Sequence, residues 1–417
     1  MRVFLSGTIG LTLVIIAGLL GGIGLWYAGE LIIESSNTED VDRNAATVAE
    51  LENSPPWMPD LIFATKEGTN VTVFSRNGET QDDTELFSYE ERVPATKSGN
   101  LWEGLPPSVA LSHDGKSIAY AKADGVYIGN LQTDESRAII SKTADPAPDD
   151  LLEIPKWDVD PAIDAYGFAI PHWSADDNFI GISTTHWEGS SLSIRGVSGD
   201  SFASAGSVGG NIYFQWSPVA NQYVLPTYGA YAKPGLYVGS GTDVEAVDIM
   251  KDNGVGFADY YEAQFSPDGT RIVFTYEPYG VEGPQEGGIR KIGVVSPDGS
   301  NFVTLPYDGK LMAPFFGPDG SDIYFAAESE PDIILRRHDL RSDTLTDMLR
   351  LPDTYNTWRF REWTERRYAL LEGVEMSQPG VEAGDRAELF AFHVESGVAV
   401  WQSGPFDAFV TFAGLVE

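Results

Sequence analysis

The sequence contains no cysteine among its 417 residues. This absence excludes disulfide bonds, zinc sites built on thiolates and enzymes with a cysteine nucleophile. It also excludes attachment to a membrane through a lipid-modified cysteine. Any membrane attachment must therefore come from an apolar segment of the chain itself.

Basic residues are scarce. Lysine and arginine together number 27, of which 10 are lysines, against 62 aspartates and glutamates, and the formal net charge is −35. A surface this acidic repels phosphate backbones, which argues against nucleic acid as a partner. The same composition indicates a halophilic protein, because dissolved ions screen the repulsion between like charges at high salt.

Charged side chains are absent from residues 3–29. A helix of this length reaches roughly 40 Å at ~1.5 Å per residue, enough to cross a hydrocarbon core of ~30 Å. A cleaved signal peptide has a shorter apolar stretch, so the sequence predicts an uncleaved transmembrane signal-anchor over residues 1–30. Arg2 precedes this helix and carboxylates follow it, which predicts a single-pass protein of the cell membrane with a cytoplasmic N-terminus.

Residues 31–59 are polar and acidic and end in Pro55-Pro56, so they are expected to form an extracytoplasmic tether. Within the predicted anchor, Gly18 and Gly22 form a small-xxx-small pair that would let another membrane helix approach closely. Glycine is also simply frequent in transmembrane helices. Both interpretations of this pair stay open.

One sequence motif recurs along residues 60–417. Its clearest copy is FSPDGTRIVFTY at 265–276, a turn-forming quartet followed by a mostly apolar strand. Six copies, 43 to 62 residues apart, begin at Leu111, Trp173, Trp216, Phe265, Phe316 and Trp363. Regular spacing in this range is typical of a repeat architecture.

The chemistry of the quartet predicts a tight hairpin. Pro267 presets the backbone at the first central turn position, Asp268 caps the turn, and Gly269 takes the left-handed conformation at its exit. A second alternating segment follows each copy after a variable loop. About four antiparallel strands in each unit of roughly 45 to 50 residues describe the blade of a β-propeller.

The sequence therefore predicts an all-β fold, a seven-bladed β-propeller preceded by one transmembrane helix, with six or eight blades as alternatives. Three strands after Asp60 lack a preceding turn motif, and one strand, FDAFVTF from Phe406, stands alone at the C-terminus. If that strand completes the first blade, the ring closes and its free sheet edges disappear. The aromatic residue before each turn is expected to fill the gap between neighbouring blades.

Ser266-Pro267-Asp268-Gly269 and Gly317-Pro318-Asp319-Gly320, each followed by an apolar strand, resemble the WD40-like Pro-Asp repeat of the TolB-like β-propeller family. The resemblance covers most of the chain after the tether and implies the propeller fold. The same repeat occurs in prolyl-oligopeptidase gates, in sugar lyases and in many scaffolds. The chain departs from TolB in lacking its small N-terminal α/β domain and in carrying a predicted anchor.

Catalytic motifs are not found. Gly115-Lys116-Ser117 resembles the end of a phosphate-binding loop. That motif requires glycine at position 110, where this chain has Ala110, and the three residues lie in a predicted hairpin and not between a strand and a helix. No Gly-x-Ser-x-Gly elbow of an α/β-hydrolase occurs. We therefore assign no catalytic residue, and whether the protein is an enzyme stays open.

Two sets of residues are candidate metal ligands. His172 and His186 flank one predicted hairpin and could approach each other, but we favour structural histidines over a metal pair. Asp158, Asp160 and Asp164 lie in a long insertion that departs from the calcium-loop pattern, because Ala162 stands at a ligand position. We expect a solvated acidic loop there, with calcium as the alternative, and no other cofactor.

Aromatic residues gather on the long loops of the face opposite the Ser-Pro-Asp-Gly hairpins. Rigidly supported aromatic residues of this kind form binding sites, although several could instead pack into their own loops. The candidate partner-binding residues are Trp157, Tyr166, Trp187, Tyr228, Tyr231 and Tyr279.

These observations predict a membrane-anchored extracytoplasmic propeller that acts as a protein–protein interaction scaffold, with a protein partner at the membrane or cell envelope. The alternative is a propeller enzyme of the saccharide lyase or hydrolase type with its site in the central channel. A convergence of His, Asp or Glu side chains on the channel favours the enzyme. An aromatic face built from loops favours the scaffold.

The charge composition makes a prediction about salt. We expect the melting temperature to rise between about 0.1 M and about 1 M sodium chloride, because shorter screening lengths weaken the self-repulsion of the acidic surface. Differential scanning calorimetry of the full-length protein measures this. A melting temperature that stays constant or falls would contradict the halophilic interpretation.

Overall fold

The structure is a computed structural model that divides the chain into two compact units, Met1–Pro56 and Trp57–Glu417. It describes residues 2–6, 10–14, 60–67, 70–90, 108–122, 125–133, 135–141, 167–168, 171–186, 189–198, 202–208, 214–228, 234–241, 246–255, 258–279, 289–329, 331–364, 368–375, 386–393, 398–403, 406–407 and 410–416.

The first unit is described only at strands β1 (Arg2–Ser6) and β2 (Gly10–Val14), which pair antiparallel. The remainder of the predicted anchor, including Gly18 and Gly22, lies outside the described residues. Among the residues that the structure describes, no helix has the length and apolar character needed to cross a lipid bilayer. The transmembrane helix and the tether stay predictions.

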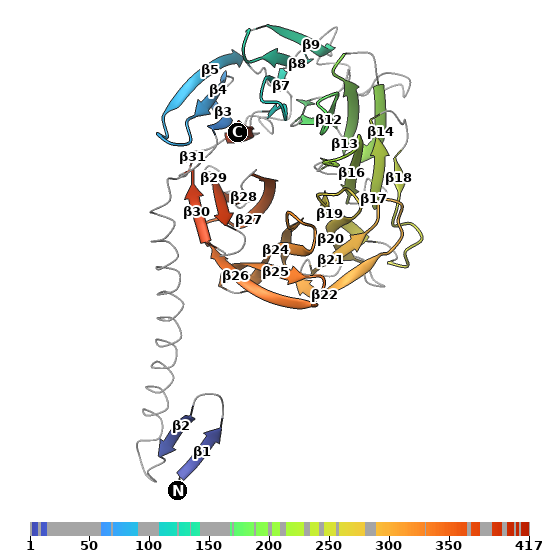
Figure 1. The fold of residues 1–417 in the computed structure, drawn as a ribbon. Coiled ribbons are helices and arrows are strands. Elements are labelled where there is room, and N and C mark those ends of the chain that lie inside the picture. Colours follow the sequence, from blue (N-terminus) through green and yellow to red (C-terminus); the bar gives the residue numbers. More distant parts are fainter. Residues whose placement is uncertain are drawn as a thin grey trace. The chain divides into compact units, whose positions relative to one another are not determined.

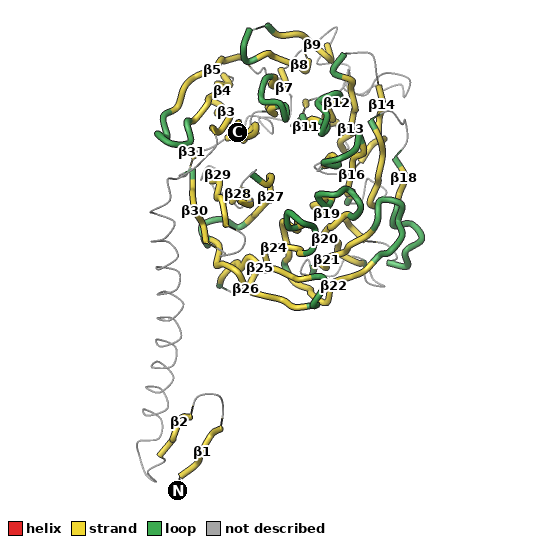
Figure 2. The backbone as a smooth tube through the Cα atoms, viewed as in Figure 1, coloured by secondary structure: helices red, strands yellow, loops and turns green. Residues whose placement is uncertain are grey.

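The second unit is an all-β ring of seven sheets, which confirms the seven-bladed propeller (Figure 1). Each sheet has a path of four antiparallel strands, and Figure 2 shows strands and loops but no helix in the described part of the ring. Successive sheets follow one another around the ring in chain order, so each blade contacts the blades that precede and follow it in the sequence.

The strands of each sheet are ordered from the inner to the outer side of the ring. Blade 1 contains β32 (Val410–Val416), β3 (Asp60–Glu67), β4 (Asn70–Arg76) and β5 (Asp83–Glu90). Blade 2 contains β6 (Val109–Leu111), β7 (Ser117–Lys122), β8 (Gly125–Asn130) and β9 (Ser136–Ser141). Blade 3 contains β10 (Gly167–Phe168) and β11 (His172–Trp173), which both pair with β12 (Phe179–His186), then β13 (Gly189–Gly196) and β14 (Phe202–Val208). Blade 4 contains β15 (Gln215–Trp216), β16 (Gln222–Thr227), β17 (Gly235–Ser240) and β18 (Val247–Asp248).

The last three sheets repeat this order. Blade 5 contains β19 (Ala258–Phe265), β20 (Ile272–Pro278), β21 (Arg290–Val295) and β22 (Val303–Gly309). Blade 6 contains β23 (Leu311–Phe316), β24 (Asp322–Ser329), β25 (Asp332–Asp339) and β26 (Thr344–Leu351). Blade 7 contains β27 (Thr357–Trp363), β28 (Tyr368–Glu375), β29 (Arg386–His393) and β30 (Val398–Gln402), and β31 (Phe406–Asp407) also pairs with β29.

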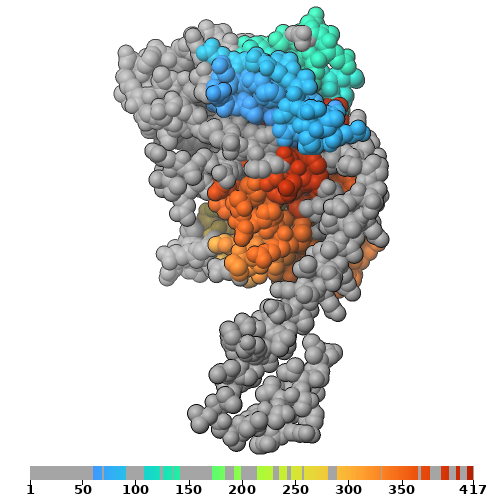
Figure 3. Space-filling view, turned by 90° about the vertical axis from the view of Figure 1, so that its left-hand side faces the viewer, coloured from blue at the N-terminus to red at the C-terminus, as the bar shows by residue number. Residues whose placement is uncertain are grey.

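The C-terminal strand closes the ring, as the sequence predicts. β32 pairs antiparallel with β3, from Val416 opposite Asp60 to Val410 opposite Thr65. Figure 3 shows the surface of residues 60–90 directly beside that of the last blades. The closing strand begins at Val410 and not at Phe406, because Phe406 and its neighbour belong to β31 and pair in blade 7. The chain leaves the last blade between these two strands.

Apolar packing between adjacent blades forms the core. Side chains of a strand point alternately to its two neighbours. On β20, Ile272 and Phe274 pack toward blade 4 whereas Val273 packs toward blade 6. Among the described residues, seven buried clusters of this kind each join one pair of neighbouring blades, and the cluster of Leu61, Phe63, Leu370, Leu389, Ala391 and Phe412 joins the last blade to the first.

The recurring hairpin has the predicted geometry. Gly269 N–H donates to the Ser266 carbonyl at 2.8 Å, Ser266 N–H donates to the Arg271 carbonyl at 2.8 Å, and Gly269 has a φ of +70°. Ser266 Oγ donates to Asp268 Oδ1 at 2.6 Å and accepts from Arg271 N–H at 3.0 Å. The hydrogen bond from Ser266 lowers the pKa of Asp268, because it favours the ionised carboxylate.

Aromatic residues before the turns contact the preceding blade, as predicted. Their indole N–H groups donate to backbone carbonyls of that blade's inner strand at 2.9 to 3.0 Å. The pairs are Trp173 with Ala110, Trp216 with His172, and Trp363 with Phe316. Each indole therefore contributes a directed bond in addition to apolar packing.

Side chains also join neighbouring hairpins. Asp177 accepts the backbone N–H groups of His113 and Asp114 at 3.0 Å, and so ties blade 3 to blade 2. Asp176 accepts Asn221 Nδ2 at 2.8 Å and ties blade 3 to blade 4. Burial alone would raise the pKa of Asp176, but hydrogen bonds from Asn221 and its own turn outweigh burial and lower the pKa to about 2.

The closing strand offers a test of the ring. Replacing Phe412, which is 7 % exposed, with alanine should lower the free energy of unfolding by about 3–5 kcal/mol, the usual cost of a cavity in a core. Val416→Ala on the same strand changes an exposed side chain and should cost less than about 0.5 kcal/mol. Urea unfolding measures both. Equal effects would show that β32 does not hold the ring together.

The hairpin carboxylate predicts a pH dependence. The pKa of Asp176 is about 2 in the folded protein against a reference of 3.8, so its stabilisation is present above about pH 4 and lost as the pH falls toward 2. Asp176→Asn should cost about 0.5 kcal/mol at pH 7, discounted for solvent screening, and nothing near pH 2. The exposed control Asp252→Asn should show no such difference in thermal unfolding, and a pH-independent loss in Asp176→Asn would refute this account.

Candidate functional site

The structure describes two of the six predicted partner-binding residues, Tyr228 and Tyr279. The other four lie outside the described residues, as do the three acidic candidates for calcium: Trp157, Tyr166, Trp187, Tyr231, Asp158, Asp160 and Asp164.

Tyr228 and Tyr279 meet around strand β19. Each follows the second strand of its blade and therefore lies at the end opposite the Ser-Pro-Asp-Gly hairpins. The rings of Tyr228 and Tyr261 lie 5.0 Å apart between centroids, and Tyr279 Oη donates to Asp259 Oδ1 at 2.7 Å. Tyr261 Oη donates to Asp259 Oδ2 at 3.4 Å, so one carboxylate connects two of the three rings. We call Tyr228, Tyr261, Tyr279 and Asp259 the tyrosine cluster.

A second carboxylate lies against this cluster. Glu277 on β20 pairs directly with Asp259 on β19, and both side chains are 9 % exposed. Like charges at directly opposite positions of an antiparallel pair repel each other. Burial, the hydrogen bond to Asp259 and the charges of both carboxylates raise the pKa of Tyr279 to about 12. The pKa of Tyr261 is likewise raised, first by burial and then by Asp259 and Glu277.

Arg290 supplies the positive charge next to the cluster. Its guanidinium lies 4.1 Å from the centre of the Tyr261 ring, a cation–π contact, and its Nη1 lies 4.0 Å from Glu262 Oε2. Glu262 also accepts the backbone N–H of Ala313, in blade 6, at 3.0 Å. Burial raises the pKa of Glu262, and Arg290 partly opposes this effect.

The inner strands of blades 5, 6 and 7 bulge at equivalent places. The pairing of β19 shifts after Tyr261, that of β23 after Met312, and that of β27 after Phe360. Glu262 and Ala313 have φ values of +44° and +49° in the first two bulges. Left-handed conformations of this kind cost free energy in residues other than glycine and often mark functional sites.

The third bulge carries two arginines that share one carboxylate. Arg361 Nη2 contacts Glu372 Oε2, and Arg359 Nη1 lies 3.9 Å from the same oxygen. Glu372 is 3 % exposed, so the positive charges replace the water that it loses on burial. Blades 5 and 7 therefore each hold a carboxylate beside arginine at the bulge of the inner strand: Glu262 with Arg290, and Glu372 with Arg359 and Arg361.

The candidate histidine pair is separated by the register of blade 3. His172 pairs with Gly181 on β12, whereas His186 ends that strand five residues further along. At about 3.3 Å per residue the two backbones lie roughly 16 Å apart, too far for the imidazoles to share a metal. Burial, followed by the charge of Arg361, lowers the pKa of His172 to about 4. The described residues contain no group of three or more metal-ligating side chains that could hold a metal ion.

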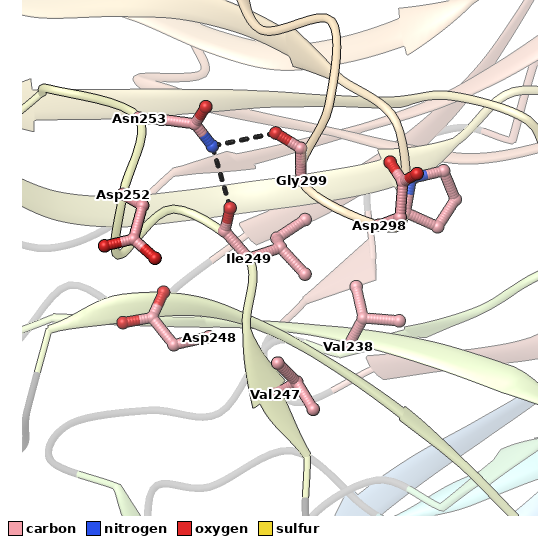
Figure 4. A pocket seen from close by; sticks show the side chains of 9 residues that line it. Val238, Val247, Asp248, Ile249, Asp252, Asn253, Asp298 and Gly299 are labelled. Atoms are coloured by element: carbon pink, nitrogen blue, oxygen red, sulfur yellow. Dashed lines mark hydrogen bonds between the residues drawn. The ribbon is translucent and has the colours of Figure 1, made fainter.

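A separate hollow of about 450 Å³ lies between blades 4 and 5 (Figure 4). Its lining combines aliphatic walls with carboxylates: Val238, Val247, Asp248, Ile249, Asp252, Asn253, Pro297, Asp298 and Gly299. Asn253 Nδ2 donates to the Ile249 carbonyl at 2.8 Å and to the Gly299 carbonyl at 3.0 Å, which fixes the two walls. This hollow lies apart from the tyrosine cluster, and its aspartates are among many on an acidic protein.

The sequence pattern predicts the tyrosines at the loop ends but not the charged residues between them. Asp259, Glu262 and Glu277 are spread over two strands that otherwise carry core residues of the best-preserved repeat. The signal in the sequence that could have found these charged residues is the presence of carboxylates inside strands that otherwise carry core residues. Their meeting with Arg290 depends on strand register, which the repeat pattern does not give.

No protein-family model and no curated protein matches the sequence. Solved structures that match include TolB-like propellers. TolB from Acinetobacter baumannii is 13 % identical over 85 % of this chain and 82 % of its own, with a TM-score of 0.41.

An oligogalacturonate lyase in complex with manganese is 12 % identical over 74 % of this chain and 83 % of its own, with a TM-score of 0.45. The tricorn protease is 13 % identical over 83 % of this chain and 34 % of its own, with a TM-score of 0.47. What these proteins share with this chain is the β-propeller fold.

Proposed function

We propose that this protein is a membrane-anchored, extracytoplasmic scaffold whose propeller binds a protein partner on the face opposite the Ser-Pro-Asp-Gly hairpins. The observation that carries the proposal is the tyrosine cluster together with Arg290. Tyrosine and arginine are enriched among the residues that dominate binding energy at protein interfaces. In this protein they lie at strand ends of two adjacent blades, where the sheets hold their backbones in place.

The cluster is organised before any partner arrives. Hydrogen bonds to Asp259 fix the hydroxyl groups of Tyr261 and Tyr279, and the contact with Arg290 fixes the Tyr261 ring. Side chains that are already ordered lose less conformational entropy on binding. An aromatic surface of this kind would support affinity without new folding.

Location follows from the N-terminal sequence. The charge-free segment 3–29 supports a single-pass anchor, and the acidic residues 31–59 support a tether that holds the propeller outside the membrane. A partner in the membrane or cell envelope then lies within reach. Gly18 and Gly22 would let the anchor associate with another membrane helix.

A second candidate function is supported by Glu262. On the inner strand β19, Glu262 combines a left-handed backbone with a partly buried carboxyl of raised pKa, and Arg290 on β21 lies beside it. A carboxyl group whose pKa is raised can act as a general acid near neutral pH. This supports a propeller enzyme acting on saccharides, and loss of a hydrolase or lyase activity in Glu262→Gln would distinguish it from the scaffold.

Affinity capture tests the scaffold. The full-length protein, extracted in mild detergent, should retain a defined membrane or envelope protein, and Tyr228→Ala should reduce the captured amount at least tenfold, as expected for an interface hot spot. Val247→Ala alters an exposed side chain of the separate hollow and should leave capture unchanged. Quantitative mass spectrometry of the eluates measures both. Equal capture by wild type and Tyr228→Ala would contradict this binding face.

A further inference from the structure

We propose that the hollow between blades 4 and 5 binds a small aliphatic diamine, a molecule with an ammonium group at each end of a hydrocarbon chain. The inference does not depend on the proposed binding face, because the hollow lies apart from the tyrosine cluster. It rests on where the hollow places its carboxylates and its aliphatic side chains.

The carboxylates of the hollow lie at its two ends. Figure 4 shows Asp248 and Asp252 on one side and Asp298 on the other. The aliphatic side chains of Val247 and Ile249 lie between them. Carboxylates accept charge-assisted hydrogen bonds from an ammonium group, and a hydrocarbon chain gains free energy when aliphatic walls replace the water around it. The order of charge, apolar surface and charge matches the order of groups in a diamine.

The aliphatic surface of the hollow is accessible to solvent. Val247 is 65 % exposed, the largest exposed fraction among the large hydrophobic residues that the structure describes. Val238 and Pro297, which are both half-buried, extend this surface. An amphipathic cation can cover such a surface with its hydrocarbon chain while its charged ends stay beside carboxylates. A metal ion has no hydrocarbon part, and the described residues contain no group of side chains that could hold one.

The two walls of the hollow are held at a fixed separation. Asn253 links them through its hydrogen bonds to the carbonyls of Ile249 and Gly299. Gly299 has a φ of +84°, and a Cβ atom at this position would lie 2.6 Å from the Ile249 carbonyl oxygen, so the close approach requires glycine. The volume of about 450 Å³ is within the range of ~300–1,000 Å³ that is usual for small-molecule sites. A site that is formed before its ligand arrives loses little conformational entropy on binding.

Neutral groups of the protein orient the carboxylates at both ends. Asp248 Oδ1 accepts the backbone N–H of Met250 at 3.1 Å. Asp298 Oδ1 accepts the backbone N–H of Ser300 at 2.9 Å and its hydroxyl at 2.6 Å. The hydrogen bonds from Ser300 lower the pKa of Asp298, so this carboxyl is ionised at neutral pH. Lys251 lies in the same loop as Asp248, but it is exposed and does not line the hollow.

A series of small probes tests the inference directly. The full-length protein in mild detergent is titrated with unbranched diaminoalkanes from diaminopropane to diaminohexane, and isothermal titration calorimetry measures each affinity. n-Butylamine carries only one ammonium group, and Mg²⁺ carries two charges without a hydrocarbon chain. We expect one diamine length to bind best, at least tenfold more tightly than n-butylamine and Mg²⁺. Similar affinities for all probes would show general attraction of cations to an acidic surface and would overturn the inference.

Two variants with equal charge changes separate the site from the general acidity of the protein. Asp298→Asn removes the carboxylate at one end of the hollow and should weaken binding of the preferred diamine at least fivefold. Asp353→Asn removes one negative charge from an exposed position outside the hollow and should change this affinity less than about twofold. Equal weakening in the two variants would contradict the proposed site.

A third variant tests the aliphatic wall. Val247→Thr keeps the shape of an exposed side chain and replaces a methyl group with a hydroxyl, so the folded structure should persist. It should weaken binding of the preferred diamine at least twofold and leave the affinity for Mg²⁺ unchanged, because only the diamine covers this wall. Unchanged affinity for the diamine would show that its hydrocarbon chain does not lie against Val247 and would refute the proposed arrangement.

Discussion

Apolar packing between neighbouring sheets is the interaction on which this structure depends. A four-stranded sheet has two apolar faces, and a sheet between two others buries both of them. The alternation along β20, with Ile272 and Phe274 on one side and Val273 on the other, shows this at the level of single residues. A linear stack would leave two faces exposed. Closure through β32 removes them, because the cluster around Phe63 and Phe412 joins the last blade to the first.

The two faces of the ring differ in how their loops are held. On the hairpin face, the short turns of blades 2, 3 and 4 bind one another through Asp176, Asp177 and backbone groups. These contacts stabilise the arrangement and constrain the sequence there. The sequence segments that connect the strands at the opposite face vary in length and carry aromatic residues. Binding and catalytic residues are more often found on loops whose sequence the fold does not constrain.

The charged residues of β19 and β20 form a costly exception within this apolar frame. Asp259, Glu262 and Glu277 occupy strands whose other residues belong to the core, and the bulge at Glu262 breaks the regular pairing of β19. Each feature reduces stability in isolation. They are concentrated in one part of blade 5, beside Arg290 and three tyrosines, and this concentration is the basis of the proposed binding face.

The amino-acid sequence by itself determined the local units: the Ser-Pro-Asp-Gly hairpins, the repeat and a C-terminal strand without partners. It favoured seven blades but left six or eight open. These follow from turn chemistry and alternation, which act over a few residues, and even Tyr228 and Tyr279 could be placed at loop ends in this way. Only the tertiary structure decided that β31 stays with blade 7, that His172 and His186 are separated, and that Glu277 faces Asp259. These depend on strand register and on which blades touch, and both are set by packing between residues far apart in the chain.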